Sequence, residues 1–550
     1  MNADNDVKTH VSSLLSFMVD GAEHSGRFQA GDWDGRSSFF AYRAATFPAG
    51  FLTLVHQDLV RKGHTVQLVK RRLPEPLGKR DFENFDSLAG DPRYDYQPET
   101  VRRLLRYGSM IAQVATGGGK SRIARMSVAA IRRTTLFITT RAVLMHQMKE
   151  GFEKDGHNVG VIGDGELKAR RGVNVAMVQT LMARLEEKTI EGEVDRLSSI
   201  EASAEKRKIE AKRAELKELK VPLLKVTKEL EKLREEIEAR RRKPAAMIAE
   251  AEQNVTRHMA LREKTIRFLE QVEFVIGEEA HEAGGNSYYE ILRFCKNAAY
   301  RLALTATPFM RADAESNMRL MACFGPIGIV VSEKMLIDRG ILATPYFKYV
   351  STPAPAVVKR SSAWQRAYKF GIVEAKERNR AIAFEAIRAV RHGLPVMILV
   401  QRKDHGAILE KALRSVGIRV RFIYGEHEND VRKDALGQLR SGELQVLIGS
   451  TILDVGIDVP AVGMVILAGG GKAEVALRQR IGRGLREKKG GVANICFIVD
   501  FTDTYNGYLK EHAMTRRQIV ESTPGFVERI IAANDDLPYH LLAVAPAAAA

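Results

Sequence analysis

The chain has 550 residues, with 85 lysines and arginines against 68 aspartates and glutamates, so its formal net charge is +17. This length suffices for three or four domains of ordinary size. A basic excess attracts polyanions and favours nucleic acid as the large partner, with an incidentally basic enzyme as the alternative. The three cysteines, Cys295, Cys323 and Cys496, are too widely spaced for a disulfide framework or a zinc site. Since no apolar run is long enough to cross a bilayer, we expect a cytoplasmic protein without a membrane partner.

The first 85 residues are expected to form a small α+β domain. They contain Trp33 in a Gly-Asp-Trp-Asp-Gly segment and a mixture of aromatic and glycine residues over 47–51. Basic clusters at 70–72 and 79–80 suit contacts with phosphates, and a solvated linker would explain them equally well.

A glycine-rich segment follows, in which a strand-like run over 110–114 leads into a turn and then a helix-like run over 122–131. The turn reads Ala115-Thr116-Gly117-Gly118-Gly119-Lys120-Ser121. The order of strand, glycine turn and helix is the context of a phosphate-binding loop. In such a loop the backbone N–H groups face phosphate oxygens, Lys120 contacts the β- and γ-phosphates and Ser121 ligates Mg²⁺. Val114 stands where the pattern usually has its first glycine, so a surface turn is the alternative for this segment alone.

A long stretch over 186–270, rich in Glu, Lys, Arg and Leu, is predicted to be a helical, coiled-coil-like insertion. Apolar residues recur in it every seven positions, namely Ile209, Leu216, Leu223, Leu230 and Ile237. Pro222 and Pro244 interrupt the pattern, so we expect a helical hairpin or a kinked arm. Residues 191–270 hold 20 basic and 17 acidic residues, so the arm is not a polycation. A wedge at a branched junction, a docking arm for a protein partner and a structural insertion are the alternatives.

A short apolar strand over 274–277 carries Glu278 and Glu279 to its carboxyl end, where parallel sheets bind ligands. We expect Glu278 to hold Mg²⁺ through water, and Glu279 to orient or deprotonate an attacking water. Without the glycine loop, a surface acidic pair would be the preferred interpretation.

The second half of the chain repeats the α/β pattern, which predicts a second parallel-sheet domain. Buried strands are expected at 396–400, 420–424, 446–448 and 464–467, with helical stretches between them and no second phosphate loop. Towards its end four polar residues with helical spacing fall on one segment: Gln479, Arg480, Arg483 and Arg486.

Taken in this order, these segments resemble the motifs of superfamily 2 helicases and translocases of the DEAH-like kind over roughly residues 96–486. The resemblance implies ATP and Mg²⁺ as cofactors and an α/β fold of two tandem RecA-like parallel-sheet domains. The N-terminal residues, with His281-Glu282-Ala283-Gly284 and the run at 324–327, are similar to phage recombination helicases of the UvsW type. Members of that type have a small N-terminal domain that binds duplex nucleic acid, which implies the same role for the N-terminal residues of this chain. If the chain is phage-encoded, we expect it in the host cytoplasm.

The resemblance also implies roles for single residues. Gln97 would read the adenine base, Thr116 would join the phosphate loop, and Gly456 and Asp458 would lie near the nucleotide. Nucleic-acid contacts would fall to Thr140, Arg141, Gln179, Thr180 and Thr451. Coupling between the two sites would fall to His281, Thr305, Thr307, Gln479 and Arg480. Arg483 and Arg486 would be arginine fingers for the γ-phosphate. Glu278 is one methylene longer than the aspartate usual at its position.

We therefore predict an N-terminal nucleic-acid-binding domain at 1–85, a first RecA-like domain at 86–335 with its insertion at 186–270, a second RecA-like domain at 336–515 and a tail at 516–550. The predicted activity is DNA-stimulated ATP hydrolysis that unwinds or remodels duplex or branched DNA, with a single strand tracked between the motor domains. An RNA helicase or the motor subunit of a restriction complex are alternatives within enzymes. An ATP-gated nucleic-acid clamp without productive hydrolysis is the alternative of another class.

Overall fold

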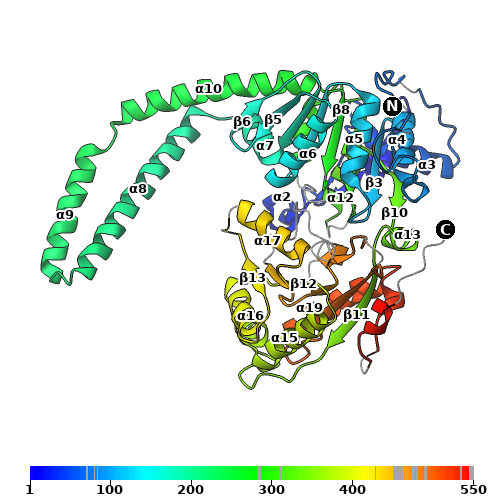
Figure 1. The fold of residues 1–550 in the computed structure, drawn as a ribbon. Coiled ribbons are helices and arrows are strands. Elements are labelled where there is room, and N and C mark those ends of the chain that lie inside the picture. The colour runs from blue at the N-terminus through cyan, green and yellow to red at the C-terminus, as the bar shows by residue number, and fades with distance from the viewer. Residues whose placement is uncertain are drawn as a thin grey trace.

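The computed structural model describes residues 1–69, 72–79, 81–82, 84–280, 286–309, 313–425, 427, 429–449, 462–471, 477–478, 481–482, 484–488, 492–532 and 535–543. Two α/β lobes lie one above the other in Figure 1, and a long helical arm projects from the upper lobe. Each lobe contains one sheet whose strands are parallel, except for one antiparallel pair at the edge of the first, so the expectation of two tandem RecA-like domains is confirmed.

The first lobe has an eight-stranded sheet in the order β10-β3-β9-β8-β4-β7-β5-β6, in which only the β5–β6 pair is antiparallel. Its strands are β3 (Ser109–Val114), β4 (Thr135–Thr139), β5 (Val159–Gly163), β6 (Glu166–Lys168), β7 (Val173–Met177), β8 (Phe274–Glu278), β9 (Tyr300–Thr305) and β10 (Ile327–Val331). Its helices are α4 (Tyr96–Tyr107), α5 (Lys120–Ile131), α6 (Ala142–Lys154), α7 (Val178–Leu185), α11 (Asn286–Phe294), α12 (Ala314–Phe324) and α13 (Glu333–Asp338), with the short η3 (Pro92–Tyr94) before α4. Helices cover the sheet, so most strand residues are buried and read as continuous apolar runs.

The second lobe has a six-stranded, all-parallel sheet in the order β11-β16-β15-β12-β14-β13. Its strands are β11 (Thr344–Val350), β12 (Val396–Leu399), β13 (Val420–Ile423), β14 (Val446–Gly449), β15 (Met464–Ile466) and β16 (Ile495–Phe501). The four strands predicted after residue 390 are therefore all present. The helices are α14 (Trp364–Tyr368), the π-helix η4 (Lys369–Val373), α15 (Lys376–Arg391), α16 (Lys403–Ser415), α17 (Asn429–Ser441), α19 (Gly507–Glu521), η6 (Val527–Arg529) and η7 (Tyr539–Ala543). Helix α19 runs through residue 516, where we had placed the start of the tail, and Phe526 and Leu537 beyond it are buried against this lobe.

The N-terminal residues form a small unit of helices and one two-stranded antiparallel sheet. Its elements are α1 (Asn5–Leu14), β1 (Ser16–Met18), η1 (Ala22–His24), α2 (Gly26–Gln29), β2 (Arg36–Ser38), η2 (Ala49–Phe51) and α3 (Leu52–Arg61). Its core includes Val11 and Phe51 and packs against Ala322 of α12. Gly50 permits this contact, because a Cβ atom there would lie 2.0 Å from the Met321 carbonyl oxygen.

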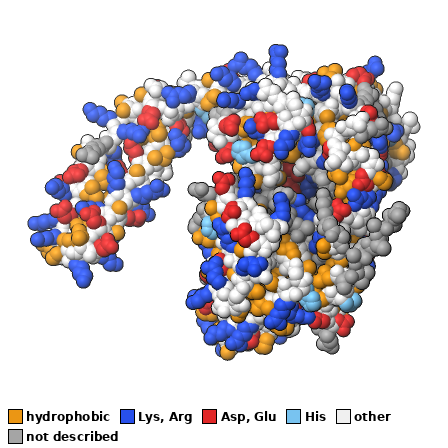
Figure 2. Space-filling model, in the orientation of Figure 1, with side chains coloured by type: hydrophobic (Ala, Val, Ile, Leu, Met, Phe, Trp, Pro, Cys, Tyr) orange, Lys and Arg blue, Asp and Glu red, His pale blue; other side chains and the backbone are white. Residues whose placement is uncertain are grey.

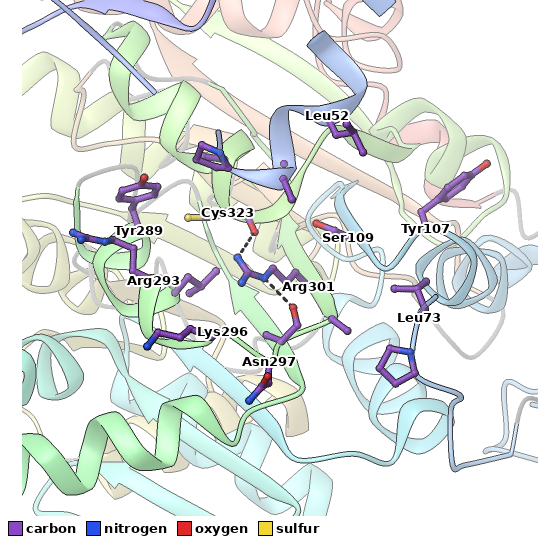
Figure 3. Close-up of a pocket in the computed structure, with 18 of the residues that line it drawn as sticks. Leu52, Leu73, Tyr107, Ser109, Tyr289, Arg293, Lys296, Asn297, Arg301 and Cys323 are labelled. Carbon is purple, nitrogen blue, oxygen red and sulfur yellow. Dashed lines mark hydrogen bonds between the residues drawn. The ribbon is translucent and has the colours of Figure 1, made fainter. Parts of the chain in front are cut away.

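A cavity of about 670 Å³ lies beside this contact, between η2 and the first lobe (Figure 3). Arg301 reaches into it and donates hydrogen bonds to the carbonyls of Ala298, Cys323 and Cys295 at 3.2, 3.4 and 3.1 Å. The cavity is lined by Ser109, the first residue of β3, so it lies at the end of that strand opposite Lys120. It is therefore separate from the phosphate loop.

The insertion is a helical arm, as predicted, and consists of α8 (Ile190–Glu218), α9 (Leu223–Arg240) and α10 (Pro244–Glu270) (Figure 1). Pro222 directly precedes α9 and Pro244 is the first residue of α10, so both prolines stand at helix starts, where the missing N–H costs little. The seven-residue repeat does not form one continuous seam: Leu216 is buried, whereas Leu223 is 84% exposed because the chain turns between them. Among the described residues, no helix is long and apolar enough to cross a membrane.

Candidate active site between the lobes

The glycine-rich turn joins β3 to α5 as the sequence predicts, with Lys120 as the first residue of the helix. Gly117 and Gly119 have φ of 89° and 79°, the left-handed region that glycine adopts without strain. A Cβ atom on Gly119 would also lie 2.3 Å from the amide nitrogen of Gln97. Val114 replaces the usual glycine without disturbing the loop, because it is fully buried beneath Gly118.

Gln97 lies directly against this loop. Its Nε2 donates to the Gly118 carbonyl at 3.1 Å, and the Tyr96 hydroxyl donates to the same oxygen at 2.9 Å. The Arg122 guanidinium donates to Gln97 Oε1 and forms a two-pronged ion pair with Asp86. These contacts orient the Gln97 amide beside the loop. Arg122 and Asp86 are not predictable from the sequence, in which only the position of Arg122 two residues after Lys120 points to a role.

The two acidic residues lie where β8 ends, next to β9 and two strands from β3 in the sheet. Lys120 Nζ lies 3.7 Å from Glu279 Oε1, so the predicted cation and the predicted water-activating carboxylate meet. Glu279 has φ of 45°, a conformation that costs energy in a residue other than glycine and recurs at functional sites. Burial raises the pKa of Glu278 to about 8, the Glu279 charge adds to this rise, and Lys120 opposes it.

The donor set at this place fits Mg²⁺. Glu278 Oε2 is buried and has no hydrogen-bond partner among the described residues. Ser121 stands in the first turn of α5, one residue after Lys120. The described residues contain no group of three or more acidic, histidine or cysteine side chains that could hold a metal. Mg²⁺ does not require such a group, because it usually takes one or two protein ligands and completes its shell with phosphates and water.

Two threonines predicted to couple the sites lie at the end of β9, of which Thr305 is the last residue. The Thr305 hydroxyl accepts a hydrogen bond from the Thr307 N–H at 3.2 Å, and both residues are buried. Because Leu304 pairs with Glu278 and Thr305 with Gln113, this turn adjoins both the acidic pair and the strand that leads into the phosphate loop.

The residues of the first lobe that we predict to bind nucleic acid all lie at the carboxyl-terminal ends of neighbouring strands of the sheet. Thr140 and Arg141 follow β4, while Gln179 and Thr180 lie in the first turn of α7, which begins directly after β7. Strands β4 and β7 are parallel neighbours, and Gln179 Nε2 donates to the Thr140 carbonyl at 3.1 Å. The structure therefore brings these two pairs of residues together.

The second lobe packs on the phosphate loop through the described residues of segment 477–488, which are 477–478, 481–482 and 484–488. A Cβ atom on Gly482 would lie 2.8 Å from Cβ and Cγ2 of Thr116. Arg486 forms an antiparallel bridge with Leu342, and the Ala343 N–H donates to the Leu485 carbonyl at 2.7 Å. Ion pairs from Arg478 to Glu333 at 3.1 Å and from Arg93 to Glu487 at 2.9 Å flank this contact. The segment predicted to carry the arginine fingers thus adjoins the loop, with the Arg486 side chain exposed.

Several predicted site residues lie outside the described part of the chain. These are His281, Thr451, Gly456, Asp458, Gln479, Arg480 and Arg483. Their roles stay predictions.

Four consecutive backbone carbonyls after β15 form a feature that the sequence analysis missed. Each accepts a hydrogen bond from a different side chain, and the pairs in chain order are Ala468 with Arg378 at 2.6 Å, Gly469 with Tyr368 at 2.7 Å, Gly470 with Gln401 at 3.1 Å and Gly471 with Arg516 at 2.9 Å. The three glycines were the only visible signal, because the donors are distant in the chain.

Both arginines of this network are buried and held by carboxylates. Arg378 pairs with Asp503 and Arg516 with Asp500, each at 2.9 Å. Charged groups fixed in this way are costly to disturb, since removing one partner leaves the other buried and unpaired. The loop that precedes segment 477–488 in the chain is therefore firmly fixed to the second lobe.

Family models match both lobes. The model described as the res subunit of type III restriction enzymes matches residues 92–310, which contain the phosphate loop and the acidic pair. The model described as the helicase conserved C-terminal domain matches residues 379–488. The chain belongs to superfamily 2 of the helicases. The helicase domains imply a nucleic-acid partner and the binding of ATP with a divalent metal.

The ATP-dependent DNA helicase uvsW of Enterobacteria phage T4 is 23% identical over 254 residues, which are 46% of this chain and 49% of the relative. The UvrABC system protein B of Caldanaerobacter subterraneus is 33% identical over 113 residues, 20% of this chain and 17% of that protein. The chain thus spans half or less of the length of these curated relatives. Among solved structures, the DUF1998 helicase MrfA bound to DNA has a TM-score of 0.52 at 13% identity, covering 86% of this chain and 59% of that one, and shares the fold.

Proposed function

We propose that this helicase hydrolyses ATP in response to DNA and uses the opening and closing of its lobes to translocate on one strand and remodel duplex or branched DNA. The packing of segment 477–488 against Thr116 carries the proposal, because it brings the second lobe onto the phosphate loop of the first. A nucleotide held at such a contact links its own hydrolysis to the relative position of the two lobes.

The residues around the loop would divide the chemistry among them. Lys120 binds the β- and γ-phosphates, and Ser121 and Glu278 hold Mg²⁺ directly or through water. When bound, Mg²⁺ neutralises phosphate charge. Glu279 orients the attacking water and accepts its proton, while Lys120, 3.7 Å away, stabilises the charge of that carboxylate. Arg483 and Arg486 supply guanidinium groups to the γ-phosphate from the second lobe.

In this proposal the nucleic acid passes across the carboxyl-terminal ends of β4 and β7 in the first lobe. Thr140, Arg141, Gln179 and Thr180 contact the backbone from the first lobe, and Thr451 does so from the second. Residues 1–85 contact the duplex ahead of this path.

The match to the restriction-enzyme model favours a second candidate, the motor subunit of a restriction complex. Both candidates use the same ATPase, so their DNA products separate them. A remodelling enzyme rearranges forked or four-way DNA by itself, whereas a restriction motor acting alone translocates without resolving a junction.

The test is an ATPase and strand-rearrangement panel with linear, forked and four-way DNA and with single-stranded RNA. We expect hydrolysis to be stimulated most by DNA and branched substrates to be rearranged only with ATP. Glu279→Gln should bind ATP normally and lose about 10²- to 10⁴-fold in turnover, the usual contribution of a general base. Glu290→Gln on α11, which lies at the surface beside Arg293, is the matched control and should behave as the unaltered protein. Absence of hydrolysis with every nucleic acid would refute the proposal, and unchanged hydrolysis in Glu279→Gln would refute the role of that residue.

A further inference from the structure

The far end of the arm differs in charge from the rest of it. Residues 217–228, here called the arm tip, join α8 to α9 and contain one acidic residue, Glu218, and four lysines, Lys217, Lys220, Lys225 and Lys228. The remainder of residues 191–270 holds 16 basic and 16 acidic side chains. All of the net positive charge of the arm therefore lies in its tip.

The tip lysines are exposed, and none of them forms an ion pair with any residue that the structure describes. By contrast, many charges elsewhere on the arm are paired, such as Arg241 with Glu205 at 2.9 Å. Three leucines share the tip with the lysines: Leu219, Leu223 and Leu224 are 66%, 84% and 78% exposed. In Figure 2 basic and apolar side chains lie at the end of the arm, with acidic ones beside them.

The arm carries its tip well away from the first lobe (Figure 1). Helix α8 has 29 residues and is therefore about 40 Å long. Close to its own start it packs on the first turns of α10 through Leu197, Met247 and Ala251. Glu193 is buried in the same place, where it pairs with Arg196 at 2.6 Å and accepts from Asn254 at 3.1 Å. These contacts make the base of the arm a packed helix pair and not a loose linker.

The base is also joined to the predicted nucleic-acid and ATP residues. Arg262 of α10 donates to the Leu185 carbonyl at 2.9 Å, where α7 ends, and α7 begins with Gln179 and Thr180 in its first turn. The chain leaving α10 enters β8, which ends at Glu278. The arm projects to the side on which α16 and α17 of the second lobe lie, with an open hollow between them (Figures 1 and 2).

The composition of the tip indicates what it binds. Lysine is depleted in the buried centres of protein interfaces, so leucines ringed by unpaired lysines suit a polyanion better than a protein partner. Lysines bind phosphates without regard to sequence, and apolar side chains pack against bases that are exposed where base pairs are interrupted. A DNA branch offers both chemistries within a short distance.

We infer that the arm tip is a second DNA-binding site that contacts a duplex branch outside the cleft between the lobes. The lysines bind the phosphates of the branch, and the leucines pack against bases at the branch point. This inference rests on the proposed function, because it takes branched DNA as the substrate of the lobes.

The test compares the full-length protein with two quadruple variants of equal charge change. The tip variant carries Lys217→Ala, Lys220→Ala, Lys225→Ala and Lys228→Ala. The control variant carries Lys206→Ala, Arg207→Ala, Lys208→Ala and Lys232→Ala, all at exposed positions on the shaft of the arm. Fluorescence anisotropy without ATP measures binding to a four-way junction and to a linear duplex over a range of salt concentrations.

We expect the tip variant to lose roughly tenfold or more in junction affinity and the control less than about threefold. The slope of log K against log salt should fall by about 0.9 for each phosphate contact removed, hence by up to about 3.6 for four lysines. Affinity for the linear duplex should change little. Equal losses in the two variants, or an unchanged junction affinity in the tip variant, would overturn the inference.

Two further measurements distinguish failure of this inference from failure of the proposed function. ATP hydrolysis stimulated by single-stranded DNA should be the same in the tip variant as in the unaltered protein. If the proposed function is wrong, neither protein will show this activity. A variant with Leu219→Ser, Leu223→Ser and Leu224→Ser should keep the salt slope and lose preference for the junction. If sedimentation instead shows that these changes dissociate a dimer while junction affinity is unchanged, the leucines belong to a contact between copies and the inference is overturned.

Discussion

The contact between Gly482 and Thr116 can be tested by adding a single methyl group. In Gly482→Ala the new Cβ atom would lie 2.8 Å from Thr116 Cβ and Cγ2, whereas ordinary van der Waals contacts begin near 3.4 Å. The two groups must therefore separate by about 0.6 Å, and both belong to backbone segments that are fixed within their lobes. Forcing extra volume into a packed contact costs about 1–3 kcal/mol.

This cost falls on the closed arrangement of the lobes, because each lobe can keep its own structure by moving away from the other. The closed population should fall roughly 5- to 150-fold, since about 1.4 kcal/mol corresponds to a factor of ten. We expect kcat/KM for DNA-stimulated ATP hydrolysis to fall by a comparable factor, while the thermal unfolding midpoint stays nearly the same. Steady-state ATPase kinetics and calorimetry measure these two quantities.

Gly437→Ala is the matched control within the same lobe. Gly437 lies within α17, and a Cβ atom there would meet nothing within 4 Å. A second change, Thr116→Ser, removes one of the two crowded atoms and should restore part of the activity of Gly482→Ala. If Gly482→Ala hydrolyses ATP as fast as Gly437→Ala, productive hydrolysis does not need the observed lobe contact, and the argument from packing fails.

Three further predictions concern stability. Arg516→Gln leaves Asp500 buried without its cation and should lower the free energy of unfolding by about 3–5 kcal/mol, measured by urea titration, whereas a loss below about 1 kcal/mol would show that the pair is dispensable. Burial and the nearby Arg378 charge lower the pKa of His405 to about 3, below its value in the unfolded chain. The free energy of unfolding should therefore fall as pH drops from about 6.5 towards 3, by up to about 1.4 kcal/mol per pH unit. A His405→Asn variant with an equally steep pH profile would contradict this. Gly50→Ala should loosen the N-terminal unit from α12 and increase proteolysis of that unit, because the added Cβ atom would lie 2.0 Å from the Met321 carbonyl oxygen. Gly26→Ala, whose Cβ atom would meet nothing within 4 Å, is the control. Equal resistance of the two variants to proteolysis would refute the importance of the contact.

The local patterns of the chain were enough to predict the elements around the nucleotide. An apolar run at 110–114, three glycines and a helical run after Lys120 led to β3, the phosphate loop and α5. The strands of the second lobe were likewise readable, because fully buried parallel strands are continuous apolar runs. Neighbouring residues set such features, so no knowledge of distant contacts was needed.

Contacts between distant parts of the chain were decided only by the folded protein. Arg378 and Ala468 are 90 residues apart, and nothing near either residue indicates that one donates to the other. The same holds for Gly482 and Thr116, whose contact depends on how two separately folded sheets pack. The seven-residue repeat of the insertion misled for a related reason: it describes a helix face, whereas the turn between Leu216 and Leu223 places the second leucine in water. Side-chain patterns specify the period and burial of single elements, but the pairing of those elements depends on the summed packing and charge of the whole fold.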